Sequence, residues 1–247
     1  MSGQQVEATT LNRQPPVPLV PVNDPAAWTK ESLGATDAWI YPLSAAEIAE
    51  LDAAVAAIEA RGLDIIDIGL GDFTLPTLQK KLAAVKHQIL HGFGLALIRG
   101  VPVARYTRLQ AAIAFWCIGL HVGVPVSQNA KGHVLGHVKN LAGSSFNNPK
   151  HRGYHTKDRL PYHCDSSDVV GLLCLHPSKS GGESLVTSSL TIYNEMVKRR
   201  PDLAAALAEP IWRDRRNEVP EGKKPYFQLP VFNRCEGALT VSWQGGY

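Results

Sequence analysis

The chain has 247 residues, of which 45% are hydrophobic and 19% are charged, a composition typical of a globular protein with one sizeable core. Its formal net charge is +3, and the charges are interspersed apart from a short patch at Arg213, Arg215 and Arg216, which we expect on a solvated surface. The four cysteines form no Cys-x-x-Cys pair, and no apolar run approaches the length of a membrane span. We therefore expect a cytoplasmic protein that binds neither nucleic acid nor a membrane.

Residues 1–43 are predicted to form an N-terminal tail and wrap. They are rich in proline, as in "NRQPPVPLVPVNDPAAW", and proline disfavours regular structure because it fixes φ and removes a backbone donor. We expect the tail to become an extended wrap near Trp28 and Trp39. A single domain is predicted over residues 44–247.

Three helices are predicted between residues 44 and 120. Ser44 and Glu47 form a capping-box pattern, and apolar residues then recur at helical spacing until Gly62. A second amphipathic helix is expected over residues 75–91. The third, over residues 107–120, is apolar nearly all round, which indicates deep burial.

Short β runs separated by turn residues dominate the second half of the chain. A first strand is predicted within "GFGLALIRGVPV", ending at the turn of Arg99 and Gly100. From about residue 133 the runs are "HVLGHVKNLA", "SDVVGLLCLH", "ESLVTSS", "PYFQLPVF" and "GALTVSW", with a helix over 190–198 that Pro201 stops. This pattern predicts a mixed, β-rich fold in which an antiparallel β core is flanked by N-terminal helices.

His163 and Asp165 are candidate metal ligands within "LPYHCDSSD". On an extended backbone, residues two apart lie on the same face, so the imidazole and the carboxylate can bind one ion, while Cys164 points away and packs. Nitrogen and oxygen ligands without thiolate suit Fe(II), Mn or Zn, and two histidines with one carboxylate are the ligands of non-heme iron oxygenases. One His-x-Asp is weak evidence in a chain with nine histidines, so its context must decide.

Several motifs follow one another around this pair. They are "GFGLALIRGVPV", then His-x-Asp before an apolar β run, then "GGES" followed by the helix "YNEM", across about residues 92–231. This order resembles the taurine dioxygenase-like (TauD/TfdA) family of Fe(II)- and 2-oxoglutarate-dependent oxygenases. The resemblance implies a double-stranded β-helix (jelly-roll) core with helices outside. It also implies oxidation of a small organic substrate with O₂ and 2-oxoglutarate, releasing succinate and CO₂.

The resemblance also implies roles for individual residues. His163 and Asp165 match the first two iron ligands of the family's triad, and Ser184 matches a hydroxyl that helps to hold the 2-oxoglutarate carboxylate. From composition alone, Ser184 is instead a turn hydroxyl that bonds its own backbone. The region that lines the substrate pocket in the resembling enzymes contains four candidate contacts, with exposed loop residues as the alternative: Gln128, Asn129, His133 and Tyr154.

The family's third ligand is a histidine far downstream, followed by an arginine whose planar fork binds the distal carboxylate of 2-oxoglutarate. The sequence contains no histidine after His176. If residues 166–175 form one strand at about 3.3 Å per residue, His176 lies on the order of 30 Å from the pair and cannot complete the site.

Upstream histidines are the remaining candidates for a third ligand. His133 and His137, like His151 and His155, are spaced four apart, which on a helix is a metal-ligand spacing. Glycines and β-type residues around both pairs disfavour a helix. His155 is the one to test, because it is nearest in sequence.

The last β run, "GALTVSWQGGY", requires a partner strand, so we expect the C-terminal strands of the jelly roll to be missing and a sheet edge to be open. A truncated homologue, a fragment of a longer enzyme and strands supplied by a partner chain are the open explanations. Three functions follow. The first is the oxygenase, and the second is an inactive homologue that acts as a binding or regulatory module through oligomerisation or edge pairing. The third is a zinc hydrolase using His151 or His155 with the His163 and Asp165 pair.

Overall fold

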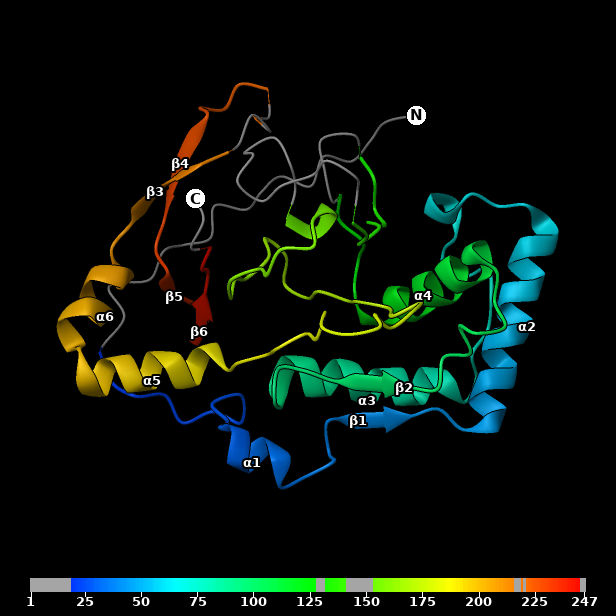
Figure 1. Ribbon diagram of the computed structural model, residues 1–247, viewed down its shortest axis with the longest axis horizontal. Helices are drawn as coiled ribbons and strands as arrows, with labels where there is room; N and C mark the ends of the chain where they lie inside the picture. The colour runs from blue at the N-terminus through cyan, green and yellow to red at the C-terminus, as the bar shows by residue number, and fades with distance from the viewer. Residues whose placement is uncertain (1–18, 128–131, 141–152, 216–218, 220, 245–247) are drawn as a thin grey trace. The chain divides into compact units, whose positions relative to one another are not determined.

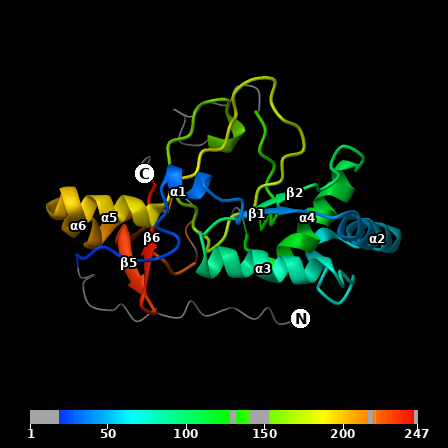
Figure 2. The same ribbon diagram turned by 90° about the horizontal axis from the view of Figure 1, so that it is seen from below.

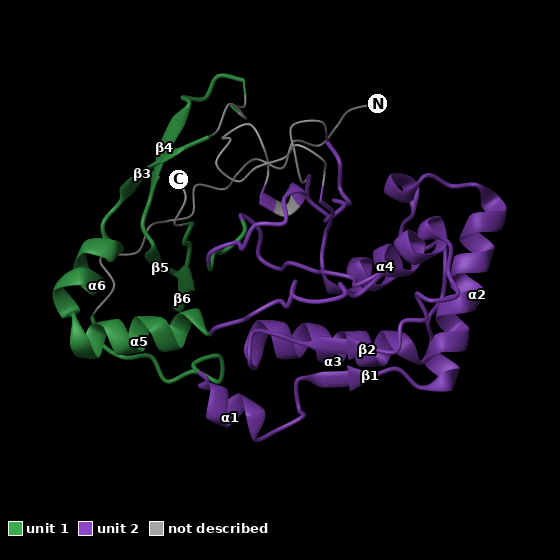
Figure 3. Cartoon of the chain, viewed as in Figure 1, with its two compact units in different colours: residues 1–27, 162–165, 188–247 green, residues 28–161, 166–187 purple. Residues whose placement is uncertain are grey.

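The computed structural model describes residues 19–127, 132–140, 153–215, 219 and 221–244 (Figure 1). The chain divides into two compact units, each with its own hydrophobic cluster (Figure 3). Unit 1 comprises residues 1–27, 162–165 and 188–247, and unit 2 comprises residues 28–161 and 166–187. Among the described residues, none of the helices is both long and apolar enough to cross a lipid bilayer.

Unit 2 is built on three helices, α2 (Ala45–Arg61), α3 (Leu78–His91) and α4 (Arg108–Val122). At the start of α2 the Ser44 hydroxyl accepts a hydrogen bond from the Glu47 N–H, and the Glu47 carboxylate accepts one from the Ser44 N–H. This capping box satisfies backbone donors that the helix itself leaves unpaired. The three helices predicted over residues 44–120 are confirmed, with ends that differ by a few residues.

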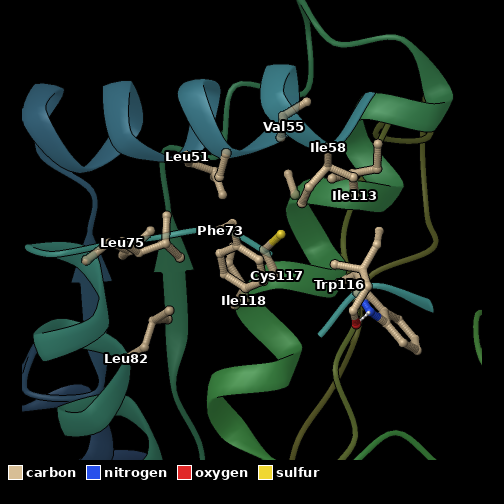
Figure 4. Close-up of a cluster of buried hydrophobic side chains, with 14 residues drawn as sticks. Leu51, Val55, Ile58, Phe73, Leu75, Leu82, Ile113, Trp116, Cys117 and Ile118 are labelled. Atoms are coloured by element: carbon tan, nitrogen blue, oxygen red, sulfur yellow. Dashed lines mark hydrogen bonds between the residues drawn. The ribbon is translucent and has the colours of Figure 1, made fainter. Parts of the chain in front are cut away.

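The apolar faces of these helices meet in one buried cluster (Figure 4). Trp116 of α4 belongs to it, and its indole Nε1 donates a hydrogen bond to the Ile68 carbonyl at 3.0 Å, so the polar edge of the ring is satisfied inside the core. Burial raises the pKa of the Cys117 thiol to about 12. The predicted deep burial of this helix is therefore confirmed. The side chains labelled in Figure 4 are Leu51, Val55, Ile58, Phe73, Leu75, Leu82, Ile113, Trp116, Cys117 and Ile118.

The region expected to be an extended wrap contains regular structure. The helix α1 (Lys30–Gly34) begins at Thr29, whose hydroxyl accepts a hydrogen bond from the Ser32 N–H. Strand β1 (Ile40–Pro42) then pairs in parallel with β2 (Leu97–Arg99), and the two strands lie side by side in Figure 2. The expected wrap therefore includes a short helix and a paired strand, because local capping and long-range pairing act here despite the proline content nearby. Residues 1–18 of the predicted tail lie outside the described residues. The strand predicted before Gly100 is confirmed.

Unit 1 combines two helices with two hairpins. The helices are α5 (Ser189–Arg199) and α6 (Pro201–Ala208). Strand β3 (Ile211–Asp214) pairs antiparallel with β4 (Tyr226–Leu229), and β5 (Phe232–Cys235) pairs antiparallel with β6 (Ala238–Val241). Tyr193 and Phe232 form the centre of the buried cluster, with ring centroids 5.0 Å apart in an edge-to-face arrangement.

Pro201 has two roles where the sequence predicted one. Helix α5 ends at Arg199, before the proline, as expected. Pro201 then occupies the first turn of α6, where its missing N–H needs no partner and its fixed φ suits the helix. The helix α6 was not predicted.

The strands of the described residues form three separate two-stranded sheets, and no closed barrel is present among them. The mixed helix and sheet prediction is confirmed, as is the strand in "GALTVSW". The run "PYFQLPVF", predicted as one β run, contains β4 and the first residue of β5, which belong to different sheets. The strand predicted over 133–142 is wrong for residues 133–140, while residues 141–142 lie outside the described residues. Strands predicted over 167–176 and 183–189 are wrong, since the structure has none there. A Cβ added to Gly171 would lie 3.1 Å from Cζ of Phe115 of α4, so this segment packs against a helix instead of a neighbouring strand. The jelly-roll core stays a prediction.

Candidate metal centre

His163 and Asp165 lie in unit 1 on a short segment, residues 162–165, that pairs with the chain just after β6. His163 forms an antiparallel bridge with Gln244. The Cys164 N–H donates to the Trp243 carbonyl at 2.7 Å, and the Gln244 side-chain amide donates to the Cys164 carbonyl at 3.0 Å. The backbone between the two candidate ligands is therefore held through both the N–H and the C=O of Cys164.

The β5–β6 hairpin brings Trp243 and Gln244 to this segment. Its two-residue turn consists of Glu236 and Gly237, with φ values of 50° and 85°. Positive φ at both positions is typical of the turn that matches the twist of paired strands. The Ser242 N–H then donates to the Val231 carbonyl at 2.9 Å. The turn thus sets the register that places Gln244 opposite His163.

The imidazole and the carboxylate of the pair are close together and accessible. His163 Nε2 lies 3.8 Å from Asp165 Oδ1, and the two side chains are 39% and 53% exposed. Two ligand atoms that each lie about 2.1 Å from one ion are separated by at most about 4 Å. The observed separation is within this limit, and side-chain rotation can shorten it. The nitrogen and oxygen donors therefore fit two positions on a divalent metal such as Fe(II).

No third ligand is assigned by the described residues, which contain no group of three His, Cys, Asp or Glu side chains able to hold a metal. His133 is an exposed loop residue and His155 is half-buried at the end of the 3₁₀ turn Gly153–His155, both in unit 2, while His151 lies outside the described residues. His176 is exposed, and the structure does not contain the strand on which its predicted distance from the pair depends.

The predicted cosubstrate residue, Ser184, lies in unit 2 on an exposed segment without strand structure. Gly181 and Gly182 precede it with φ values of 71° and 76°, and the Ser178 hydroxyl donates a hydrogen bond to the Gly181 carbonyl. The turn predicted at "GGES" is present, while the following strand is not. The role of the Ser184 hydroxyl stays a prediction.

The structure describes the predicted substrate contacts only in part. Gln128 and Asn129 lie outside the described residues. His133 is exposed, and Tyr154 is described for its backbone alone, within the 3₁₀ turn Gly153–His155. The four substrate contacts therefore stay predictions.

Arg213 of β3 is a half-buried cation beside the metal-ligand segment, within unit 1. Its guanidinium donates from Nη2 to the Ser242 carbonyl at 2.6 Å and from Nη1 to the Ser242 hydroxyl at 3.3 Å. Burial lowers the pKa of Arg213, and the neighbouring Cys164 thiol opposes this shift. The predicted solvated patch is wrong for Arg213, because alternation along β3 places it on the same inward face as Ile211.

Sequence reasoning missed Arg213, Trp243 and Gln244 as neighbours of the ligand pair. Gln244 is 80 residues from Cys164, and a pairing at that separation leaves no periodic signal in the sequence. The only local sign was the "EG" dipeptide before "ALTV", which predicts a hairpin turn and hence the strand direction. For Arg213 the local signal is that it alternates with Ile211 and Arg215 along the sequence, which places the three residues on one face of a strand.

Comparisons with known proteins identify the family of the chain and two relatives. The family model described as taurine catabolism dioxygenase TauD, TfdA family matches residues 53–241. FR-33289 synthase of Streptomyces rubellomurinus is 32% identical over 223 residues, which cover 90% of this chain and 66% of the relative. Taurine hydroxylase-like protein SAT17 of Stachybotrys chartarum is 30% identical over 230 residues, covering 90% and 58% respectively. The chain thus spans less than two thirds of each relative, and it belongs to the taurine catabolism dioxygenase TauD, TfdA family.

Proposed function

We propose that this chain contains the iron-binding part of an Fe(II)- and 2-oxoglutarate-dependent oxygenase that acts on a small organic substrate. The observation that carries the proposal is the His163 and Asp165 pair, with Nε2 and Oδ1 3.8 Å apart on a backbone fixed by Gln244. Family membership supports the reaction class. The names of the two relatives, a taurine hydroxylase-like protein and a synthase, differ, so the substrate is not carried over.

His163 Nε2 and the Asp165 carboxylate would hold the iron, and the Ser184 hydroxyl would donate to a 2-oxoglutarate carboxylate. When bound, iron and 2-oxoglutarate supply the activation of O₂ that oxidises a substrate C–H bond, with succinate and CO₂ as products. The exposed side chains of the pair leave room for further ligands on the metal. The family pattern assigns these positions to a third histidine, the cosubstrate and O₂.

A spectroscopic experiment tests the proposal. Under anaerobic conditions, adding Fe(II) and 2-oxoglutarate to the wild-type chain is expected to give a visible metal-to-ligand charge-transfer band. The variant Asp165→Ala removes one ligand and is expected to lose the band. The variant Asp168→Ala removes an exposed carboxylate three residues away and is expected to keep it. A wild-type chain that gives no band, or a band of equal intensity in Asp165→Ala, would sink the proposal.

The second candidate function is a catalytically inactive family member that binds or regulates another chain. It is favoured by one observation, namely that no third ligand for the metal pair is found among the described residues. Light scattering after size exclusion, with and without a complete homologue, discriminates between the two. An inactive binding module forms a complex with itself or the homologue, whereas a chain that stays monomeric in both samples argues against it. No observation favours the zinc hydrolase.

A further inference from the structure

Two histidines lie one helical turn apart at the end of α3, away from the residues assigned above. His87 and His91 are both exposed, and their ring centroids are 5.1 Å apart with an angle of 56° between the planes. Residues four apart on a helix share one face, and side chains tilt toward the N-terminus, which brings the ring of His91 over that of His87. No hydrogen bond or ion pair of either imidazole is found within the described part of the chain.

The separation of the two rings matches the geometry of chelation. Zn–N bonds of about 2.1 Å place each imidazole centroid about 3.2 Å from the ion, so two rings on a tetrahedral ion have centroids about 5 Å apart. The observed 5.1 Å agrees with this value. The ring separation is therefore compatible with one nitrogen from each imidazole binding a common ion.

The surroundings also favour a cation. His91 is the last residue of α3, and the neighbouring Gly92 N–H donates to the Gln88 carbonyl at 3.0 Å. The C-terminal end of a helix carries a partial negative charge from its remaining carbonyls, which stabilises positive charge nearby. On the same face, the preceding residues Ala83 and Ala84 add neither charge nor bulk.

We propose that His87 and His91 bind a divalent transition-metal ion of the copper, nickel or zinc class, with water in the remaining positions. Imidazole nitrogen suits these ions, and the order of affinities across the series favours Cu²⁺ over Ni²⁺ and both over Fe²⁺. No third His, Cys, Asp or Glu joins the pair among the described residues, so the site exchanges its metal with solution. The site is separate from His163 and Asp165 and does not depend on the proposed function.

This site has a direct consequence for metal analysis of the protein. Zinc or nickel bound at α3 would add to the total metal content of the protein and would give no information on the iron centre. The reaction class must therefore be judged from variants of each site and not from total metal content.

The test is a titration with Ni²⁺ that is monitored by calorimetry. It uses untagged protein carrying Asp165→Ala, because this change disrupts the His163 and Asp165 pair, which would compete for the metal. The parent is expected to bind one equivalent of Ni²⁺ at α3. Adding His91→Gln leaves a single imidazole, and loss of the chelating partner is expected to weaken this binding about 100-fold. Adding His176→Gln, which changes an exposed histidine elsewhere, is expected to leave it unchanged.

A second variant separates chelation from the number of histidines. The double change Gln88→His and His91→Gln keeps the histidine count but places the rings at neighbouring positions, which diverge around the helix. It is expected to bind Ni²⁺ as weakly as His91→Gln alone. If either variant binds Ni²⁺ with the affinity of the parent, the proposal is overturned. Circular dichroism of each variant confirms that α3 is retained.

Discussion

Gln244 is the residue that connects the candidate metal centre to the rest of unit 1. Its side-chain amide donates to the Cys164 carbonyl, and its backbone lies opposite His163. Both contacts hold the backbone at His163 and Cys164, and neither of them involves a candidate ligand atom. The side chain of Gln244 is therefore a positioning group, and its effect should be measurable as metal affinity.

Replacing Gln244 by alanine is predicted to weaken Fe(II) binding about three- to tenfold, because the lost hydrogen bond contributes about 0.5–1.5 kcal/mol. In this variant, part of the free energy of Fe(II) binding must order residues 162–165. Anaerobic titration of Fe(II) measures the effect. The matched control is Gln228→Ala, an exposed glutamine on β4. Equal affinities for Gln244→Ala and the wild type would show that the segment is held by other contacts.

Arg213 contacts the residue just before Trp243 and Gln244, which pair with the candidate ligand segment. Its guanidinium donates two hydrogen bonds to Ser242. Arg213→Ala is predicted to lower the free energy of unfolding of unit 1 by about 1–3 kcal/mol, because it leaves the half-buried Ser242 carbonyl without its partner. Urea denaturation checks this value. Arg199→Ala removes an arginine that is 76% exposed and paired with Glu195, and the loss there is expected to stay below about 1 kcal/mol. Similar losses for both variants would contradict the role of Arg213.

At the scale of elements, α2 depends on an ion pair at its first turn. Glu47 is buried, and its Oε2 lies 2.5 Å from Lys81 Nζ of α3 and 2.7 Å from the Ser44 N–H. Burial alone would raise the pKa of Glu47. Lys81, through its hydrogen bond and its charge, and Ser44, through its hydrogen bonds, have the opposite and larger combined effect. The pKa of Glu47 is therefore below its ordinary value. The charged carboxylate therefore stabilises the folded state.

This arrangement predicts a pH dependence. The pKa of Glu47 is lower in the folded state than in the unfolded state, where it is about 4.3. The carboxylate therefore contributes fully to the free energy of unfolding above that pH, and the contribution is lost as the pH falls through the pKa of the folded state. Glu47→Gln is expected to destabilise the protein by about 2 kcal/mol at pH 7, and the difference from wild type should narrow below about pH 4. Urea denaturation at pH 7, 5 and 3.5 measures it, with the exposed Glu183→Gln as control. A difference that stays constant to pH 3.5 would be inconsistent with this charge effect.

The elements that could be predicted from sequence are those whose signals are local. The capping box of Ser44 and the apolar periodicity after it lie in and beside α2, so they predict this helix without reference to any other part of the chain. The segment 167–176 has strand-forming residues but packs by Gly171 against Phe115. Whether an apolar run becomes a strand depends on a partner strand elsewhere, which composition does not reveal.

The same limit applies to the candidate site. His163 and Asp165 could be proposed from sequence because residues two apart on an extended backbone lie on the same face. The structure places Nε2 of His163 and Oδ1 of Asp165 3.8 Å apart. Gln244 and Arg213 could not be proposed, because their contacts with this segment connect strands that are distant in sequence. The pair of His87 and His91 had a helical spacing that was visible in the sequence and was overlooked.

At the scale of the whole molecule, the chain combines a confirmed family membership with a candidate site whose residue roles stay predictions. It spans 66% and 58% of the two relatives. The metal pair and the residues that position it, Gln244 and Arg213, all belong to unit 1. Iron binding therefore tests the proposed centre independently of the predicted role of Ser184, which lies in unit 2.

The most direct measurement is equilibrium binding of Fe(II), under anaerobic conditions, to the wild type and to Asp165→Asn and Asp168→Asn. Both variants remove one carboxylate charge, and only the first removes a proposed ligand. The wild type and Asp168→Asn are predicted to bind Fe(II) with equal affinity, and Asp165→Asn at least about tenfold more weakly, since changes even beyond the direct ligands cost that much. Equal affinity in all three proteins would contradict an iron centre at His163 and Asp165.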